Sequence, residues 1–124
     1  MAILHTCMNV SDADELADWY VDQLDFERSW EFTSEDGETR NVYVADENGV
    51  EIQLSDTEGE DEFEAGTEWD HLALKVEDVD AAFAEIDDHG VEKEPADQPA
   101  AGARTAFIKD PDGHVVELIE PLDD

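Results

Sequence analysis

The chain has 124 residues, 40% of them hydrophobic, so it is long enough to bury a core and too apolar to be disordered by composition alone. Asp and Glu number 37 against six Lys and Arg, a formal net charge of −31, and six cations cannot form the basic surface that nucleic acid or an anionic membrane requires. Because the acidic residues are spread along the chain, they do not form an acidic interaction tail. They indicate a halophilic protein, in which dissolved salt screens the repulsion between the acidic side chains.

The cellular compartment is predicted from what the chain lacks. Cys7 is the only cysteine, so no intrachain disulfide is possible. The N-terminus has no basic region followed by an apolar run, so no signal peptide is expected. No stretch approaches the ~20 apolar residues of a membrane span. We expect a cytoplasmic protein.

The first half of the chain predicts one strand, one helix and three more strands. Leu16, Tyr20 and Leu24 recur at helical spacing, and Ser11-Asp12 is suited to cap that helix. Asn48-Gly49 marks a hairpin turn between the last two strands. The expected elements are a strand at 2–10, a helix at 14–24, and strands at 26–32, 40–45 and 50–55.

The second half repeats this order after an acidic, glycine-containing linker at 56–68. The expected elements are a strand at 69–76, a helix at 78–88 closed by Gly90, a strand at 91–94, a loop at 95–102, and a hairpin of strands at 104–109 and 114–120. The pattern predicts one domain, 1–124, of the α+β class. Two βαβββ modules, 1–55 and 69–124, would form a mostly antiparallel sheet.

An internal duplication underlies the repeated order. The twelve residues Tyr43–Leu54 align without a gap on Phe107–Leu118 at a constant offset of 64. Upstream, His5–Asp12 aligns on His71–Asp78 at an offset of 66. Each copy thus begins with a histidine and ends with a Gln or Glu. Four nitrogen and oxygen donors result, a set suited to a divalent metal: His5, Gln53, His71 and Glu117.

Four segments resemble the vicinal oxygen chelate superfamily, and within it the glyoxalase I (lactoylglutathione lyase) family. They are Leu4–Thr6, Trp19–Leu24, Asp70–Leu74 and, most specifically, Asp110–Glu120. The resemblance covers essentially the whole chain. It implies that the two modules form a cupped sheet around a metal, the glyoxalase/bleomycin-resistance/dioxygenase fold.

The resemblance also implies an assembly. In short members of the family the cup is completed across a homodimer. His5 and Gln53 would then come from one subunit and His71 and Glu117 from the other. A symmetric dimer is also the commonest oligomer on general grounds.

The activity implied by the resemblance is that of a metal-dependent lyase. It isomerises the hemithioacetal of a 2-oxoaldehyde such as methylglyoxal to a thioester, through a metal-bound enediolate. Glu117 matches the family residue that both binds the metal and acts as the general base. The co-substrate would be a low-molecular-weight thiol. Short bacterial relatives favour Ni or Co and longer ones Zn, and an N/O donor set does not choose between them.

Other residues are candidates for binding the substrate or thiol. Asn9 and Lys75 share strand faces with His5 and His71, so they are expected to contact the substrate. Arg104 and Lys75 are cations that would hold a carboxylate. Taken singly, either histidine would more often be an ordinary strand residue than a ligand. Glu117 is less so, because an unpaired carboxylate in an apolar strand is costly.

Two departures from glyoxalases weaken the assignment of the thiol and of the reaction. Glyoxalases usually have Glu at the position of Gln53, and Gln coordinates through oxygen but accepts no proton. Asn9 and Thr57 replace an Arg and an Asn that contact glutathione in the short glyoxalases. These replacements leave open a thiol other than glutathione, or no thiol at all.

Three other functions stay open. The His, Gln, His, Glu set resembles that of methylmalonyl-CoA epimerase, which uses the same metal-enolate chemistry. A ring-cleaving dioxygenase would use His5, His71 and Glu117 to hold iron. A bleomycin-resistance-type binding protein would hold no metal and offer an aromatic-lined groove instead.

Overall fold

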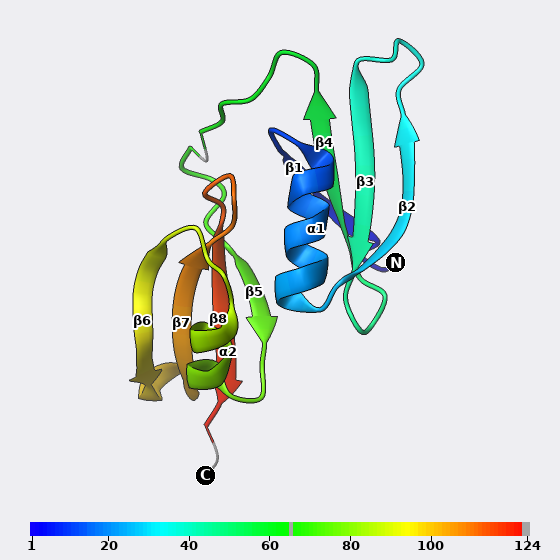
Figure 1. Cartoon of the computed structure of the whole chain (residues 1–124). Helices are drawn as coiled ribbons and strands as arrows, with labels where there is room; N and C mark the ends of the chain where they lie inside the picture. Colours follow the sequence, from blue (N-terminus) through cyan, green and yellow to red (C-terminus); the bar gives the residue numbers. More distant parts are fainter. Residues whose placement is uncertain (65, 123–124) are drawn as a thin grey trace. The chain divides into compact units, whose positions relative to one another are not determined.

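The computed structural model describes residues 1–64 and 66–122, and the chain divides into two compact units, Met1–Glu64 (unit 1) and Ala65–Asp124 (unit 2) (Figure 1). Each unit has a four-stranded sheet with one α-helix on one face. The expected tandem βαβββ fold of the α+β class is confirmed. Within the described residues, no helix is long and apolar enough to cross a membrane.

Unit 1 has the strand order β1-β4-β3-β2. Its elements are β1 (His5–Asn9), α1 (Ala13–Leu24), β2 (Glu27–Thr33), β3 (Thr39–Ala45) and β4 (Glu51–Thr57). β1 runs parallel to β4, and the other neighbours are antiparallel. Helix α1 packs on β3 and β4. The core between them is made of Met8, Val10, Leu16, Tyr20, Val42, Val44, Ile52 and Leu54.

Unit 2 repeats that topology with the order β5-β8-β7-β6. Its elements are β5 (Leu72–Lys75), α2 (Val79–Glu85), β6 (Val91–Gln98), the 3-10 helix η1 (Pro99–Ala101), β7 (Ala103–Lys109) and β8 (Val115–Pro121). β5 is parallel to β8, and the other pairs are antiparallel. Val79, Ala106, Ile108, Val116 and Leu118 are its fully buried apolar residues on the helix side.

The boundaries differ from expectation at several elements. Strands β1 and β5 begin later, at His5 and Leu72, and β4 continues to Thr57, into the expected linker. The rest of that linker includes Ala65, which lies outside the described residues. Helix α2 ends at Glu85 instead of residue 88, where two consecutive aspartates would oppose the helix dipole.

Strand β6 is the largest difference, because it continues through Pro95 to Gln98 where a loop was expected. The pairing of β6 with β7 shifts register between Lys93 and Ala96. Pro95 lies within this irregularity. Proline has no backbone N–H to donate, and the regular hydrogen-bond ladder that would need one is interrupted here.

Both helices begin at an aspartate assisted by a second carboxylate from the sheet. Asp12 accepts hydrogen bonds from the backbone N–H groups of Asp14 and Glu15, both at 3.1 Å, and Asp56 accepts one from Ala13 at 3.1 Å. In unit 2, Asp78 accepts from Ala81 at 3.0 Å and Glu120 accepts from Val79 at 2.9 Å. The equivalent acids are separated by the offsets of the duplication, so the repeat extends to the caps.

An arginine on the helix side is duplicated in the same way. Arg40 forms ion pairs with Asp14 at 3.0 Å and Glu31 at 2.9 Å. Arg104 forms ion pairs with Asp80 at 2.8 Å and Asp97 at 3.1 Å. Each arginine therefore connects the first turn of a helix to the edge strand of its sheet.

Candidate metal and substrate site

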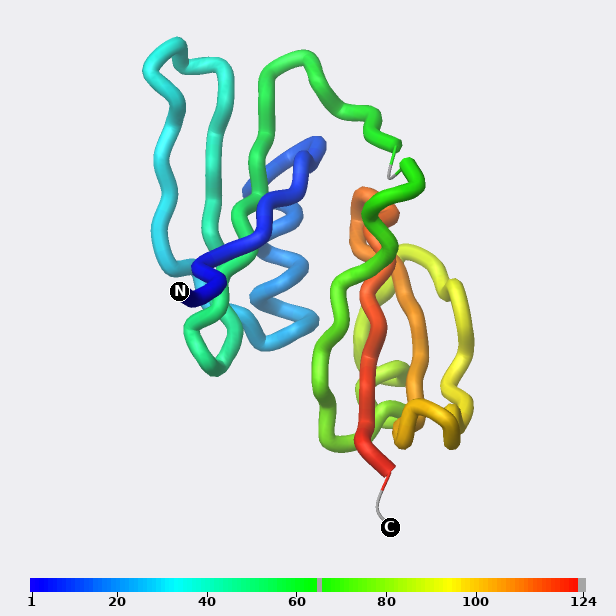
Figure 2. Tube along the Cα trace, turned by 180° about the vertical axis from the view of Figure 1, so that it is seen from behind, coloured from blue at the N-terminus to red at the C-terminus, as the bar shows by residue number. Residues whose placement is uncertain are grey.

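Unit 1 has an open sheet face, opposite α1, that carries His5 and Gln53. Neighbouring residues Met8, Ile52 and Leu54 are buried on the helix side, so the residues between them point the other way. Gln53 is paired with Cys7 on β1 and with Tyr43 on β3, which places these side chains on one face. Figure 2 views this sheet from the side away from α1.

His5 and Gln53 both lie next to Tyr43 on this face. The imidazole of His5 meets the Tyr43 ring edge-on, with centroids 5.5 Å apart and planes at 85°. Gln53 is the direct cross-strand neighbour of Tyr43, and its Nε2 donates a hydrogen bond to Asn41 Oδ1 at 2.8 Å. Unit 1 thus brings together an imidazole and an amide around one aromatic ring.

An aromatic row extends across the same face. Trp30 stacks on Tyr43 with centroids 4.3 Å apart, and on Phe32 at 5.3 Å. Trp30 remains 50% exposed and Phe32 41% exposed. This aromatic row was not predicted from the sequence. The sequence feature that could have revealed it is the spacing of Trp30 and Phe32, two residues apart in one strand, which places both side chains on one face.

Unit 2 repeats this arrangement with charged groups. His71 Nε2 lies 2.8 Å from Glu117 Oε1. The His71 ring meets Phe107 edge-on, with centroids 5.3 Å apart and planes at 83°. Phe107 is the cross-strand neighbour of Glu117, as Tyr43 is of Gln53. The three residues therefore match His5, Tyr43 and Gln53 in strand position, and the two edge-on ring pairs match in geometry.

Asp70 holds the other nitrogen of His71. Asp70 Oδ2 lies 2.6 Å from His71 Nδ1. This hydrogen bond is the main reason that the pKa of His71 is raised above its ordinary value; burial opposes the rise and Glu117 adds to it. With Nδ1 bound to Asp70, Nε2 is the nitrogen that faces Glu117. This role of Asp70 was not predicted, although an acid directly before His71 was visible in the sequence.

The predicted cations of unit 2 fall on different faces. Lys75 pairs with Ile119 and lies on the same face as Glu117. Lys93, which the sequence analysis did not consider, pairs with Phe107 and has its Nζ 5.2 Å from that ring's centroid. Arg104 pairs with Glu120 on the helix face, and the ion pair with Asp80 raises its pKa. The structure does not bring Arg104 to the other predicted residues.

Asn9 lies on the open face of unit 1, at the end of β1. It lines a hollow of about 370 Å³ together with the segment 59–63. This hollow contains neither His5 nor Gln53. Asn9 is therefore placed beside the predicted ligands on the sheet, at the border of a separate depression.

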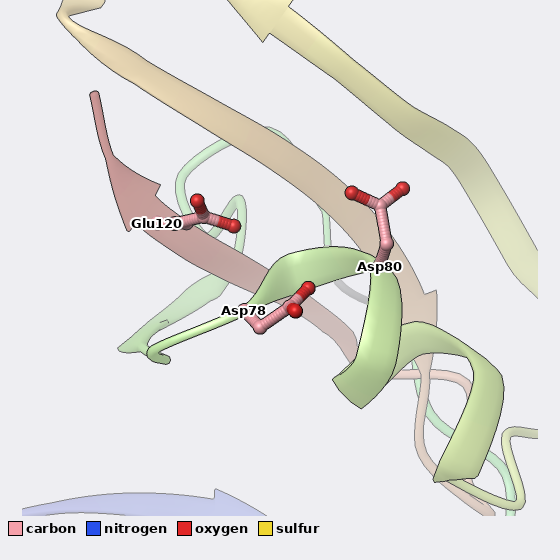
Figure 3. Close-up of side chains that lie close together, drawn as sticks. All are labelled: Asp78, Asp80 and Glu120. Atoms are coloured by element: carbon pink, nitrogen blue, oxygen red, sulfur yellow. The ribbon is translucent and has the colours of Figure 1, made fainter. Parts of the chain in front are cut away.

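Three carboxylates on the helix side of unit 2 also lie close together. Asp78, Asp80 and Glu120 have oxygens within 4.8 Å of one another (Figure 3). Two of them accept hydrogen bonds from the first turn of α2, and Asp80 pairs with Arg104. The cluster is explained by helix capping and does not include any predicted metal ligand.

The four predicted ligands lie two on each unit: His71 contacts Glu117 in unit 2, and His5 and Gln53 both lie beside Tyr43 on the open face of unit 1. Two imidazoles, an amide oxygen and a carboxylate are donors that fit a divalent transition metal. Donors about 2.1 Å from one ion lie about 3 Å apart, which is close to the separation of His71 and Glu117. The donor set of each unit is therefore compatible with half of a metal site.

The fold consists of two tandem βαβββ modules. Each of the two units carries two of the predicted metal ligands. Residues 2–118 match the model of the Glyoxalase/Bleomycin resistance protein/Dioxygenase superfamily. The chain belongs to this superfamily.

Proteins similar to this chain include glyoxalases. The chain is 34% identical to a lactoylglutathione lyase of Haemophilus influenzae, over 97% of this chain and 93% of that protein. Glyoxalase I from Zea mays superposes with a TM-score of 0.84 at 25% identity, over 98% of this chain and 45% of that longer chain. The trypanothione-dependent glyoxalase I of Leishmania major gives 0.79 at 25% identity, over 97% of this chain and 86% of that chain.

Proposed function

We propose that this protein is a glyoxalase I-type lyase that isomerises the hemithioacetal of a 2-oxoaldehyde, such as methylglyoxal, to a thioester. The observation that carries the proposal is the contact of His71 with Glu117 at 2.8 Å, beside an edge-on aromatic ring that recurs between His5 and Gln53. The similarity to a lactoylglutathione lyase over nearly the full length of both chains supports it.

The proposed metal ligands are His5, Gln53, His71 and Glu117, holding Ni, Co or Zn. When bound, the ion would stabilise the negative charge that develops on two adjacent substrate oxygens. The proposed site is formed in a homodimer, with His5 and Gln53 of one subunit and His71 and Glu117 of the other.

Glu117 is the proposed general base. It would remove the proton from the carbon that bears sulfur and return one to the neighbouring carbon. Its side chain is only 14% exposed, which protects the transferred proton from exchange with bulk water. Gln53 cannot accept a proton, so we propose that one carboxylate serves both steps.

We further propose that the thiol co-substrate is anionic and is held by Lys75 and Lys93 of unit 2, and that Asn9 of unit 1 also contributes to its binding. Four of the six cations make ion pairs with carboxylates: Arg28, Arg40, Arg104 and Lys109. Among the described residues, neither Lys75 nor Lys93 has such a pair, although the chain carries 37 acids. Because Arg104 is bound to two aspartates, it is left out of the proposed site.

The test is thioester formation from methylglyoxal mixed with a panel of thiols, glutathione among them, on metal-loaded protein in high salt. We expect Lys93→Gln to raise KM for the preferred hemithioacetal about 10-fold, the value of one charge-assisted contact. Lys109→Gln removes the same charge where a lysine is already paired, and should change KM little. Absence of thioester with every thiol would overturn the proposal.

An epimerase acting on an acyl-CoA is the second candidate, favoured by Gln53 at the place of the usual Glu. A metal-free binding protein is the third, favoured by the exposed aromatic row around Trp30. Epimerisation of a 2-methyl-branched acyl-CoA without lyase activity would support the second. Tight binding of a planar ligand by protein without metal would support the third.

A further inference from the structure

We propose that Asn41 is a positioning residue that orients the amide of Gln53, so that its oxygen and not its nitrogen faces the proposed metal. The inference rests on the proposed function, because it takes Gln53 to be a metal ligand. It concerns a residue that neither the sequence motifs nor the donor set identify.

The need for such a residue follows from the chemistry of an amide. A carboxylate offers an oxygen in either of its two flipped orientations. The amide of Gln53 offers one oxygen that binds a cation and one NH2 group that only donates hydrogen bonds. A rotation of about 180° therefore turns a ligand into a group that repels the ion. A glutamine ligand needs a neighbour that selects one orientation.

Asn41 is placed to make that selection. Its side chain is buried, with 4% exposed, and its Oδ1 accepts the hydrogen bond from Gln53 Nε2 at 2.8 Å. In this orientation the oxygen of Asn41 meets the NH2 group of Gln53, since an amide oxygen accepts and does not donate. Gln53 Oε1 is then the atom left to coordinate.

The second unit of the same chain supplies an internal comparison. At the duplication offset of 64, Gln53 corresponds to Glu117 and Asn41 to Thr105. Where the ligand is a carboxylate, the buried neighbour has no amide, and Glu117 contacts His71 instead. The amide neighbour therefore accompanies the amide ligand and is absent beside the carboxylate, as an orienting role requires.

A purely structural role for Asn41 makes a different prediction from a positioning role. A buried polar group needs a hydrogen-bond partner whatever its function. Its loss would then weaken the sheet equally, whichever residue stands at position 53. A positioning role matters only when the side chain at position 53 ends in two different groups, such as the oxygen and the NH2 group of an amide.

The experiment exploits this difference with four full-length proteins. They are the wild type, Asn41→Leu, Gln53→Glu, and the double variant. Ni²⁺ affinity of each is measured by competition with a chromophoric chelator in high salt, and folding is checked by thermal unfolding. We expect Asn41→Leu to weaken Ni²⁺ binding at least ~10-fold beside Gln53, the usual effect of losing a group that orients a metal ligand, and less than ~2-fold beside Gln53→Glu.

Three further variants make the result decisive. Asn41→Asp keeps the acceptor and should retain most of the affinity. Thr105→Val alters the equivalent position of unit 2, and should leave Ni²⁺ binding unchanged. If Asn41→Leu does not fold, Asn41→Val, which is smaller and also lacks a hydrogen-bonding group, should show the same dependence on residue 53.

Two outcomes would overturn the ideas separately. An equal loss of affinity in both backgrounds, or no loss in either, would reduce Asn41 to a structural residue and leave the proposed lyase intact. The ligand role of Gln53 is tested with one additional variant, Gln53→Leu, and unchanged Ni²⁺ affinity in this variant would remove Gln53 from the ligand set. The proposed metal site, and not only the orienting role of Asn41, would then fail.

Discussion

At the scale of single residues, His71 lies between two carboxylates and uses a different nitrogen for each. Nδ1 contacts Asp70 at 2.6 Å and Nε2 contacts Glu117 at 2.8 Å. A carboxylate on the distal nitrogen fixes the tautomer and orientation of a ligating histidine. We therefore propose that Asp70 prepares Nε2 for the metal.

The first prediction concerns the pH response of His71 in metal-free protein. Its pKa is raised above 6.5, mainly by Asp70, so its charged form adds stability that is complete below the unfolded pKa and is lost as pH rises through the folded pKa. Asp70→Asn should lower the pKa of His71 and move the rise of Ni²⁺ affinity to lower pH. NMR titration of the ring protons measures the shift; an unchanged pKa would contradict the assignment.

The second prediction distinguishes the role of Glu117, the proposed carboxylate ligand, from that of Gln53, the proposed amide ligand. Glu117→Gln keeps an oxygen donor but removes the base, so kcat should fall by roughly 10²–10⁴-fold even where metal is retained. Gln53→Glu adds a carboxylate and should keep activity. Measured metal content normalises both values. Full activity in metal-loaded Glu117→Gln would exclude Glu117 as the base.

At this scale, only some of the residues of the candidate site could be predicted from the sequence. The internal duplication singled out His71 and Glu117 as candidate ligands, a prediction that stays untested, and the two side chains are in contact in the structure. Asn41, Asp70 and Lys93 were not identified, because their contacts depend on strand register and side-chain rotamer. A sequence pattern alone gives neither the register between strands nor the rotamer of a side chain.

At the scale of secondary-structure elements, each helix begins with a shared device. The cap aspartate satisfies N–H groups inside the first turn, and an acid from the sheet satisfies the N–H before them. Since Asp56 and Glu120 project from β4 and β8, they attach α1 and α2 to the sheets that they cover.

The third prediction tests this device. Asp12→Ala should lower the free energy of unfolding by about 1 kcal/mol, the usual cost of an N-cap aspartate. Chemical denaturation in constant high salt measures the change. Asp22→Ala, on the same helix beyond the first turn, controls for the loss of one negative charge. Equal effects of the two substitutions would argue against capping.

Some element boundaries could be derived from the sequence and others could not. Helix α1 follows from its apolar spacing and its cap, and it forms at 13–24 as predicted to within one residue. Strand β6 was shortened in the prediction because Pro95 normally ends a strand. The register shift that admits Pro95 depends on how β7 pairs with β6.

At the scale of the whole molecule, the charge of −31 must be accommodated by the folded chain. Arg28, Arg40 and Arg104 each contact more than one carboxylate. These three residues cannot offset 37 acids, so most of the repulsion is left for dissolved salt to screen.

The fourth prediction follows from that repulsion. The midpoint of thermal unfolding should rise as KCl is increased from about 0.1 M, where the screening length is about 10 Å, to about 1 M, where it is about 3 Å. Sucrose of equal osmolality should raise it much less, because it stabilises without screening. A midpoint that does not depend on KCl would contradict the proposed adaptation to high salt.

The central claim is that four side chains from two modules hold one ion. The most direct test is the metal content of purified, Ni²⁺-loaded protein after gel filtration, in the wild type and two double variants. The account predicts about one ion per chain in the wild type, and loss of it in both His5→Ala/Gln53→Ala and His71→Ala/Glu117→Ala. Full metal content in either double variant would show that one module binds the ion alone, and would contradict the claim.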